Sequence, residues 1–263
     1  MLMSNKKGVI MGLTNEHSIA WSIAKRLKNE GAELIFTYPN DRLATRMKPL
    51  VESLGCKIML QCDVLDEASI TTTFQRIGEE FGKLDFLVHS IAFSDKSELK
   101  GRYINTTKDN FLTTMHVSCF SFTEICKFAE PLMSDGGSII TLSYYGAEKV
   151  MPNYNVMGVA KAALECSVRY LSEDLGRSRV RVNAISAGPI KTLAASGIGD
   201  FSHILSFNSK HSPLRRTVSQ EEVAGSALYL LSDLSSGVTG EIHYVDAGYN
   251  VIGMPGIKHN TEQ

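Results

Sequence analysis

The chain has 263 residues, 43% of them hydrophobic and 21% charged, which is enough to bury a large core, and we expect a single domain over residues 1–263. Twenty-seven Lys and Arg against 28 Asp and Glu give a formal net charge of −1, which excludes a global field that would attract nucleic acid or an acidic membrane surface. No segment approaches the roughly 20 apolar residues of a membrane span, and the apolar run 8–13 is too short for a signal-peptide core, so we expect a cytoplasmic protein.

The cysteines and histidines do not form a recognisable metal-binding pattern. The five cysteines are scattered, without a C-x-x-C pair, and we expect reduced, mostly buried thiols. The seven histidines show no ligand pair at useful helical spacing with carboxylate support. We therefore expect no metal site.

Short apolar runs alternate with helix-length amphipathic stretches along the chain. Strands are expected at Gly8–Met11, Glu33–Tyr38, Lys57–Gln61, Phe86–Ser90, Ser138–Leu142, Arg181–Ile185 and Ile242–Val245. Helices are expected at Ser18–Glu30, Asp66–Phe81, Thr107–Met133, Tyr154–Leu175 and Glu221–Ser232, with C-terminal caps at Gly31, Gly82 and Gly176. This alternation predicts an α/β fold, a doubly wound, Rossmann-like parallel sheet of about seven strands with helices on both faces.

The turn after the first strand is a candidate pyrophosphate site. Gly12 allows a tight turn, and the helix that begins near Ser18 and Ile19 could point its N-terminus at a phosphate. Only Gly12 remains of the full G-x-G-x-x-G pattern, so an ordinary turn with Ser18 as N-cap is the alternative.

Further candidate cofactor contacts follow the third and fourth strands, because an open parallel sheet binds its ligand at the carboxyl ends of its strands. Asp63, followed by Val64, could accept a hydrogen bond from an adenine amino group, or could instead cap the next helix. Ile91 could lie along the cofactor or belong to the core. His89 fits a structural role better than a catalytic one.

The second strand ends in residues 37–42 without an acidic residue to grip a ribose 2′-hydroxyl. Arg42 could pair with a 2′-phosphate, but no tight basic cluster accompanies it. The sequence therefore favours NADH and leaves NADPH possible.

Tyr154 and Lys161 form the most informative pair. They are seven residues apart, and at 100° per residue they return to within about 20° of the same helix face. If one helix carries both, both side chains can point into one cleft.

This Tyr-x6-Lys spacing resembles that of bacterial enoyl-acyl-carrier-protein reductases of the FabI type, within the short-chain dehydrogenase/reductase superfamily. Most short-chain dehydrogenases have Tyr-x3-Lys with a Ser thirteen residues before the Tyr; here those two positions hold Met157 and Tyr144. The resemblance extends from about Lys7 to Ala247 and departs from the family at Pro39, Ala92 and Ser94.

The resemblance implies a catalytic role for Tyr154, Lys161 and Tyr144 in the reduction of a trans-2-enoyl thioester, the last reductive step of type II fatty-acid elongation. It implies substrate contacts from Ser94, Tyr144 and Tyr154. It also implies that Lys161 holds the nicotinamide ribose and that Ile190, Thr192 and Ala194 contact the cofactor.

The resemblance further implies an acyl carrier protein as partner and a homotetramer. Apolar residues on the long helices (Phe120, Phe122, Tyr170 and Leu171) are candidates for subunit contacts, with a purely intramolecular core as the alternative. Lys210, Arg215 and Arg216 are candidate docking residues for the acidic carrier. Residues 191–213 are irregular in pattern and are expected to form either a substrate loop or a disordered excursion.

Two other functions compete with this one. A reductase of the same fold acting on a ketone or alcohol would lack its usual proton donor, because Met157 replaces the tyrosine. A nucleotide-binding regulator without catalytic activity would have no need of Tyr154 and Lys161 together.

Overall fold

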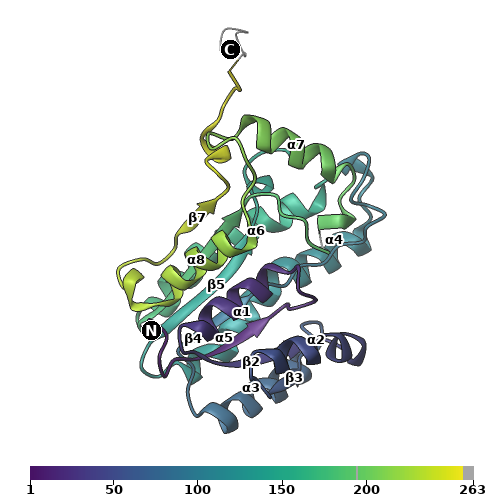
Figure 1. Cartoon of the computed structure of the whole chain (residues 1–263). Helices are drawn as coiled ribbons and strands as arrows, with labels where there is room; N and C mark the ends of the chain where they lie inside the picture. The colour runs from purple at the N-terminus through teal and green to yellow at the C-terminus, as the bar shows by residue number, and fades with distance from the viewer. Residues whose placement is uncertain (194, 257–263) are drawn as a thin grey trace.

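A seven-stranded parallel sheet forms the centre of the molecule. The computed structural model describes residues 1–193 and 195–256, and its strands run in the order β3-β2-β1-β4-β5-β6-β7. Figure 1 shows these strands with the helices around them. Their bounds are β1 Lys7–Met11, β2 Glu33–Tyr38, β3 Met59–Gln61, β4 Phe86–His89, β5 Gly137–Ser143, β6 Val180–Ala187 and β7 Ile242–Val245.

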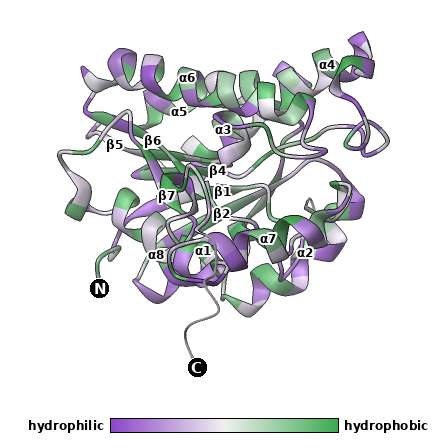
Figure 2. Ribbon diagram, turned by 90° about the horizontal axis from the view of Figure 1, so that it is seen from above, coloured by the Kyte–Doolittle hydropathy of each residue, from purple (hydrophilic) through white to green (hydrophobic). Residues whose placement is uncertain are grey.

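Helices cover both faces of the sheet. One face carries α1 Ile19–Asn29, α2 Asp41–Ser53 and α8 Gln220–Leu231. The other face carries α3 Glu67–Phe81, α5 Ser121–Ala129 and α6 Val156–Gly176, with α4 Lys108–Met115 continuing into α5 through a π-helical turn at His116–Phe120. Figure 2, seen from above, shows these two helical layers with the sheet between them. The predicted fold class is confirmed.

Alternating side chains of each strand build two separate cores. In β1, Ile10 packs with α1 and α8, whereas Val9 and Met11 point to the opposite face and join α3, α5 and α6. Ile139 and Ile140 of β5 divide in the same way, and all five side chains are fully buried. Strands buried on both faces explain why the sequence shows continuous apolar runs.

All seven predicted strands are present, and the structure contains two helices that we did not predict. We did not expect α2, which contains Pro49, or α7, which spans Phe201–His211. The prediction that residues 191–213 are irregular is wrong over α7, because an eleven-residue helix crosses that segment. Figure 1 places α7 at the end of the molecule where the described chain also ends.

Two of the three expected glycine caps have the left-handed backbone typical of a helix end. Gly31 (φ 95°) follows α1, and Gly82 (φ 71°) ends α3. The prediction for Gly176 is wrong: it is the last residue of α6, and the left-handed residue after that helix is Arg179 (φ 60°).

The cysteines are free, as expected, and all of them except Cys166 are buried. Within the described ranges, no helix has both the length and the apolar character needed to cross a bilayer.

Candidate active site

The predicted site residues follow the carboxyl ends of five strands, β1, β3, β4, β5 and β6. Because the sheet is parallel, those five ends share one edge.

Gly12 is where the ends of β1 and β4 come into close contact. Its φ is +89°, and a Cβ at this position would lie 2.0 Å from the backbone oxygen of Ser90. Only glycine satisfies both the left-handed backbone and the contact. The turn thereby brings residues 12 and 90–91 together without an intervening side chain.

The N-terminus of α1 begins beside this turn and is not capped by a side chain. Ser18 occupies the N-cap position, but its hydroxyl donates to the Asn15 carbonyl oxygen (2.7 Å). The first turn of α1 has no acidic residue, and Ile19 begins the helix. The positive end of the helix dipole is therefore left for an anion from outside the chain.

Asp63 does not cap α3, so that alternative is wrong. The N-cap of α3 is Asp66, whose carboxylate accepts from Ala68 N (3.0 Å). One carboxylate oxygen of Asp63 accepts from Leu65 N (3.0 Å), and within residues 1–193 and 195–256 the other oxygen has no hydrogen-bond partner. The neighbouring Val64 is buried in the core.

Three further residues that we predicted to contact the cofactor, Ile91, Ile190 and Thr192, also have contacts within the protein. Ile91 packs on the core beneath α3 and α5, and Ile190 packs on the opposite core. The Thr192 hydroxyl accepts from Ala195 N (3.1 Å). Ala194 lies outside the described residues.

Tyr144 and Tyr154 meet edge to face. Their ring centroids are 5.0 Å apart at an interplanar angle of 76°. Tyr144 directly follows β5, and Gly146 provides the space for the Tyr154 ring, because a Cβ there would lie 2.4 Å from that ring. The two hydroxyl-bearing rings thus form one aromatic pair.

Tyr154 is not on the helix that carries Lys161, which corrects the helical-face argument. α6 begins at Val156, and Tyr154 lies in the preceding turn between two left-handed residues, Asn153 (φ 62°) and Asn155 (φ 44°). Asparagine tolerates this backbone better than most side chains. The Asn155 amide donates to the Glu98 carbonyl oxygen (2.9 Å), which ties the turn to a distant loop.

Both tyrosines are neutral hydrogen-bond donors at physiological pH. Burial raises the pKa of Tyr144 and of Tyr154 well above the usual range. The Tyr144 hydroxyl is buried and has no hydrogen-bond partner among the described residues. A buried hydroxyl in that state can donate to a ligand without breaking an existing bond.

Lys161 lies buried on α6 and reaches back to the strand. Its ammonium donates to the Leu142 carbonyl oxygen (2.7 Å). Burial lowers its pKa to about 8, and the effect is partly offset by Cys119 and Glu165. Leu142 is the one hydrogen-bond partner of the ammonium among the described residues, so two of its three N–H donors are available there for other groups.

Ser94 does not present a free hydroxyl. It is buried, and its Oγ contacts Asn110 (3.2 Å to Nδ2) and Thr114 (2.9 Å to Oγ1) on α4. Its predicted contact with substrate stays a prediction.

Comparison with known proteins gives a consistent result. The model of the family described as "Enoyl-(Acyl carrier protein) reductase" matches residues 12–250. The chain belongs to this family.

Two relatives and two solved structures illustrate the similarity. Enoyl-[acyl-carrier-protein] reductase [NADH] 1 of Rhizobium meliloti is 61% identical over 97% of this chain and 94% of its own. The Rickettsia typhi reductase [NADH] FabI is 57% identical over 96% and 97%. An Anaplasma phagocytophilum reductase solved with NAD has a TM-score of 0.95 at 59% identity, covering 98% of both chains. A Bacillus cereus reductase solved with NADP+ and indole naphthyridinone has a TM-score of 0.94 at 48% identity, covering 96% and 99%.

This family member contains a buried pair that the sequence analysis missed. Ser143 Oγ donates to the carboxylate of Glu165, and both residues are buried. Glu165 stands four residues after Lys161, so the two side chains share one face of α6. Its position beside Leu164 and Val168, which are core residues, was the signal available in the sequence.

His89 is structural, as the sequence favoured. It is fully buried at the end of β4, where its ring nitrogens contact Thr141 Oγ1 (3.3 Å) and Ser121 Oγ (3.0 Å). Burial lowers its pKa to about 3, with a smaller contribution from Lys161, so the ring is neutral.

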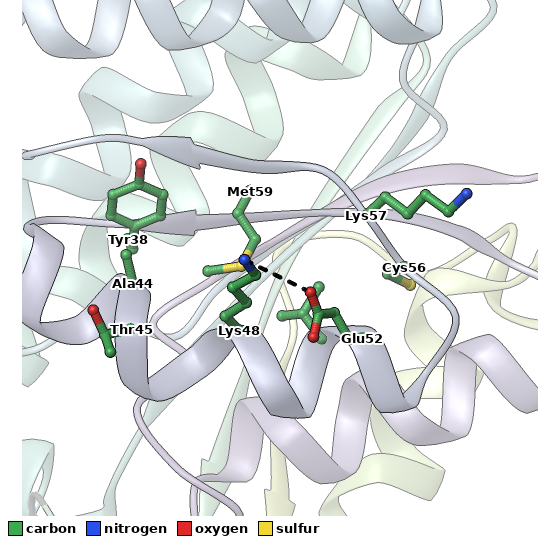
Figure 3. Close-up of a pocket in the computed structure, with 9 residues that line it drawn as sticks. Tyr38, Ala44, Thr45, Lys48, Glu52, Cys56, Lys57 and Met59 are labelled. Carbon is green, nitrogen blue, oxygen red and sulfur yellow. Dashed lines mark ion pairs between the residues drawn. The ribbon is translucent and has the colours of Figure 1, made fainter.

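A separate pocket of about 310 Å³ lies between α2 and the β2–β3 edge of the sheet (Figure 3). Lys48 and Glu52 face each other there across an i,i+4 ion pair (4.0 Å). No sequence-predicted site residue lines this pocket. It is lined by Tyr38, Ala44, Thr45, Lys48, Val51, Glu52, Cys56, Lys57 and Met59.

Proposed function

We propose that this protein is an NADH-dependent enoyl-acyl-carrier-protein reductase, which reduces the trans-2 double bond of enoyl thioesters. The observation that carries the proposal is the aromatic pair Tyr144–Tyr154, which lies with Lys161 at the end of β5, on the edge where β1 and β4 form a dinucleotide-type turn. The description of the family as an enoyl-acyl-carrier-protein reductase agrees with this chemistry.

The residues on this edge fit a dinucleotide. Gly12 leaves room for close approach of a backbone, and α1 presents an N-terminus without a side-chain cap. Among the described residues, one carboxylate oxygen of Asp63 has no partner. We assign Gly12, Ser18 and Ile19 to the pyrophosphate end. Asp63 and Val64 belong to the adenine end.

The nicotinamide end is assigned to Ile91, Lys161, Ile190, Thr192 and Ala194. When bound, NADH supplies the hydride that reduces the β-carbon of the substrate. We expect NADPH to serve less well, because Arg42 is the single cation close after β2 and is exposed.

Tyr154 donates its hydroxyl proton in a hydrogen bond to the thioester oxygen, where negative charge develops as the double bond is reduced. The raised pKa of Tyr154 keeps this donor protonated. Donors aimed at a developing oxyanion typically contribute about 3 kcal/mol to barrier lowering.

Lys161 holds the ribose hydroxyls with its remaining N–H donors and contributes a positive charge close to the reacting oxygen. Its bond to the Leu142 carbonyl oxygen fixes the direction of the ammonium group. Tyr144 lines the thioester pocket, and its partnerless hydroxyl positions the substrate.

We further propose that the subunit is one domain, that it is cytoplasmic and that it assembles as a homotetramer serving an acyl carrier protein. Of the candidate contact residues, Phe122 and Leu171 are buried in the subunit, whereas Phe120 and Tyr170 are 52% and 74% exposed and can contact another subunit. Lys210 and Arg215 remain candidates for carrier docking. Arg216 forms a two-pronged pair with Glu222 (2.7 and 2.8 Å).

The decisive experiment follows the loss of NADH absorbance with crotonyl thioester for the wild type, Tyr154→Phe and Lys161→Ala, and repeats it with NADPH. We expect turnover by the wild type, and a fall of roughly 10²-fold or more in kcat/KM in each variant. Tyr145→Phe is the matched control, because the Tyr145 ring packs against Tyr244 and Tyr249.

Tight binding of NADH without turnover of any enoyl thioester would contradict the proposal and favour a regulator. Turnover of a ketone that survives Tyr154→Phe would favour the carbonyl reductase.

A further inference from the structure

The buried pair Ser143–Glu165 joins the two segments that carry the catalytic groups. Ser143 is the last residue of β5 and directly precedes Tyr144, while Glu165 lies one helical turn beyond Lys161 on α6. The Ser143 hydroxyl donates to the Glu165 carboxylate, and the two residues are 5% and 6% exposed. A charge-assisted bond out of water is of the stronger kind.

This bond is one of two parallel ties between α6 and β5. Lys161 donates to the carbonyl oxygen of Leu142 (2.7 Å), and Glu165 accepts from the adjacent residue, Ser143. Lys161 and Glu165, one turn apart on α6, are therefore hydrogen-bonded to two consecutive residues at the end of β5. The next residue along the chain is Tyr144, so the ties determine where its ring stands against Tyr154.

Glu165 also supplies negative charge to Lys161. The other groups that face Lys161 are Cys119 in the π-helical turn and His89 on β4. Burial raises the pKa of the Cys119 thiol and lowers that of His89, so both are neutral near pH 7. Glu165 is then the acidic group whose ionised form favours the charged ammonium.

Burial raises the pKa of the Glu165 carboxyl, and the groups around it act in both directions. Glu148, after β5, raises its pKa, whereas Arg169 on α6 and the Ser143 hydroxyl lower it. Tyr154 and Tyr244 also face it, and both are neutral because burial raises their pKa. Burial is the largest influence on the carboxyl and raises its pKa, with Ser143 as the main opposing contact.

We propose that Glu165 is a positioning residue of the reductase: through Ser143 it holds the end of β5, and with it Tyr144, and its charge faces the ammonium of Lys161. The inference rests on the proposed function. Glu165 touches neither substrate nor cofactor and acts through its neighbours.

The test uses Glu165→Gln, which keeps the size and the acceptor for Ser143 but removes the charge. Without that charge the pKa of Lys161 falls further below about 8. We expect the basic limb of kcat/KM, and the alkaline weakening of NADH binding followed by fluorescence, to move to lower pH. Glu173→Gln, an exposed change on the same helix, leaves both profiles in place.

Ser143→Ala tests the hydrogen bond between Ser143 and Glu165 while the Glu165 carboxyl group stays in place. It removes the bond to Glu165 but keeps the carboxyl group, so we expect kcat to fall several-fold at every pH. Ser186→Ala is the matched control, because Ser186 pairs with Ser143 in the sheet and its buried hydroxyl has no described partner.

Wild-type pH profiles in Glu165→Gln, or wild-type kcat in Ser143→Ala, would overturn the inference. If Glu165→Gln does not fold, Ser143→Ala carries the decision on its own. The proposed function fails separately, when the wild type itself does not turn over enoyl thioester. The pH dependence of NADH binding still tests Glu165 in that case.

Discussion

At the scale of single residues, the tyrosines after β5 show that neighbouring side chains of one type can have opposite roles. The Tyr145 hydroxyl donates to the Asn250 carbonyl oxygen (3.2 Å), so it is a structural contact. The Tyr144 hydroxyl is buried without such a partner. A group that is not needed for stability and is still desolvated is a good candidate for contact with a ligand.

Tyr144→Phe should therefore leave the free energy of unfolding unchanged or raise it by up to about 1 kcal/mol, because an unsatisfied buried hydroxyl is removed. Its kcat/KM for enoyl thioester should fall about tenfold or more. Denaturant unfolding and steady-state kinetics check the two effects. Tyr145→Phe should show the reverse pattern, and a destabilised but fully active Tyr144→Phe would contradict the assignment.

Because the buried ring of His89 is neutral, we expect the free energy of unfolding to fall as the pH is lowered. Its pKa is about 3 in the folded protein against about 6.5 when exposed, so only the unfolded chain takes up this proton between those values. The stability from His89 is complete above about pH 6.5 and is lost as the pH falls toward about 3, with a loss of about 2 kcal/mol by about pH 5.

His89→Asn should be less stable than the wild type at about pH 7.5, by about 1 to 3 kcal/mol, because two buried contacts are disturbed. It should lose less stability than the wild type on acidification to about pH 5. Urea unfolding at both pH values measures this. The exposed His17→Asn serves as control and should keep the wild-type slope.

At the scale of elements, the periodicity of apolar residues predicted the strands correctly, because their position follows from burial. It missed helices whose position depends on particular local contacts. The strands were predictable because runs such as 86–89 are buried on both faces. α2 was missed because Pro49 argues against a helix interior, although Met47 and Val51 anchor it to the core.

The candidate active site was likewise predicted in part from the sequence. The sequence predicted Tyr154 and Lys161 as a pair but placed Tyr154 on α6, since helical spacing carries no information about the left-handed Asn153 and Asn155 that end the turn. The tie between Ser143 and Glu165 joins residues 22 apart through tertiary packing, and spacing alone cannot reveal it. α7 was missed because a segment rich in Ser and His has weak helical preference.

The N-terminus of α8 allows a test at this scale. Ser219 and Glu222 form a capping box, in which the Ser219 hydroxyl accepts from Glu222 N (3.3 Å) and the Glu222 carboxylate accepts from Ser219 N (2.8 Å). Ser219→Ala should lower the free energy of unfolding by about 1 kcal/mol. Thermal unfolding measures this loss. Ser202→Ala, in the exposed first turn of α7, should have little effect, and equal effects would argue against the cap.

At the scale of the whole molecule, two exposed aromatic side chains provide a test of the proposed tetramer. Phe120 and Tyr170 are exposed, whereas their neighbours in the sequence, Phe122 and Leu171, are buried in the core of the subunit. Exposed large aromatic groups of this kind are typical of subunit contacts.

The double variant Phe120→Asp/Tyr170→Asp should therefore have a lower mass than the wild type in light scattering after gel filtration. Its circular dichroism should stay unchanged, because neither side chain belongs to the subunit core. Leu112→Asp/Leu214→Asp, two other exposed apolar positions, shows whether added charge alone has this effect. A wild type that elutes as a monomer would contradict the tetramer.

The strand order has a consequence for how such a protein can be altered. In our assignment the pyrophosphate and adenine ends of the coenzyme lie at the turns after β1 and β3, whereas Tyr144 and Tyr154 lie between β5 and α6, and β4 separates β1 from β5 in the sheet. The turns on the two sides of β4 can therefore change in length or composition separately. Under the proposed function, the choice between NADH and NADPH at the adenine end and the selectivity for the acyl chain are separate traits, which selection or an engineer can adjust one at a time.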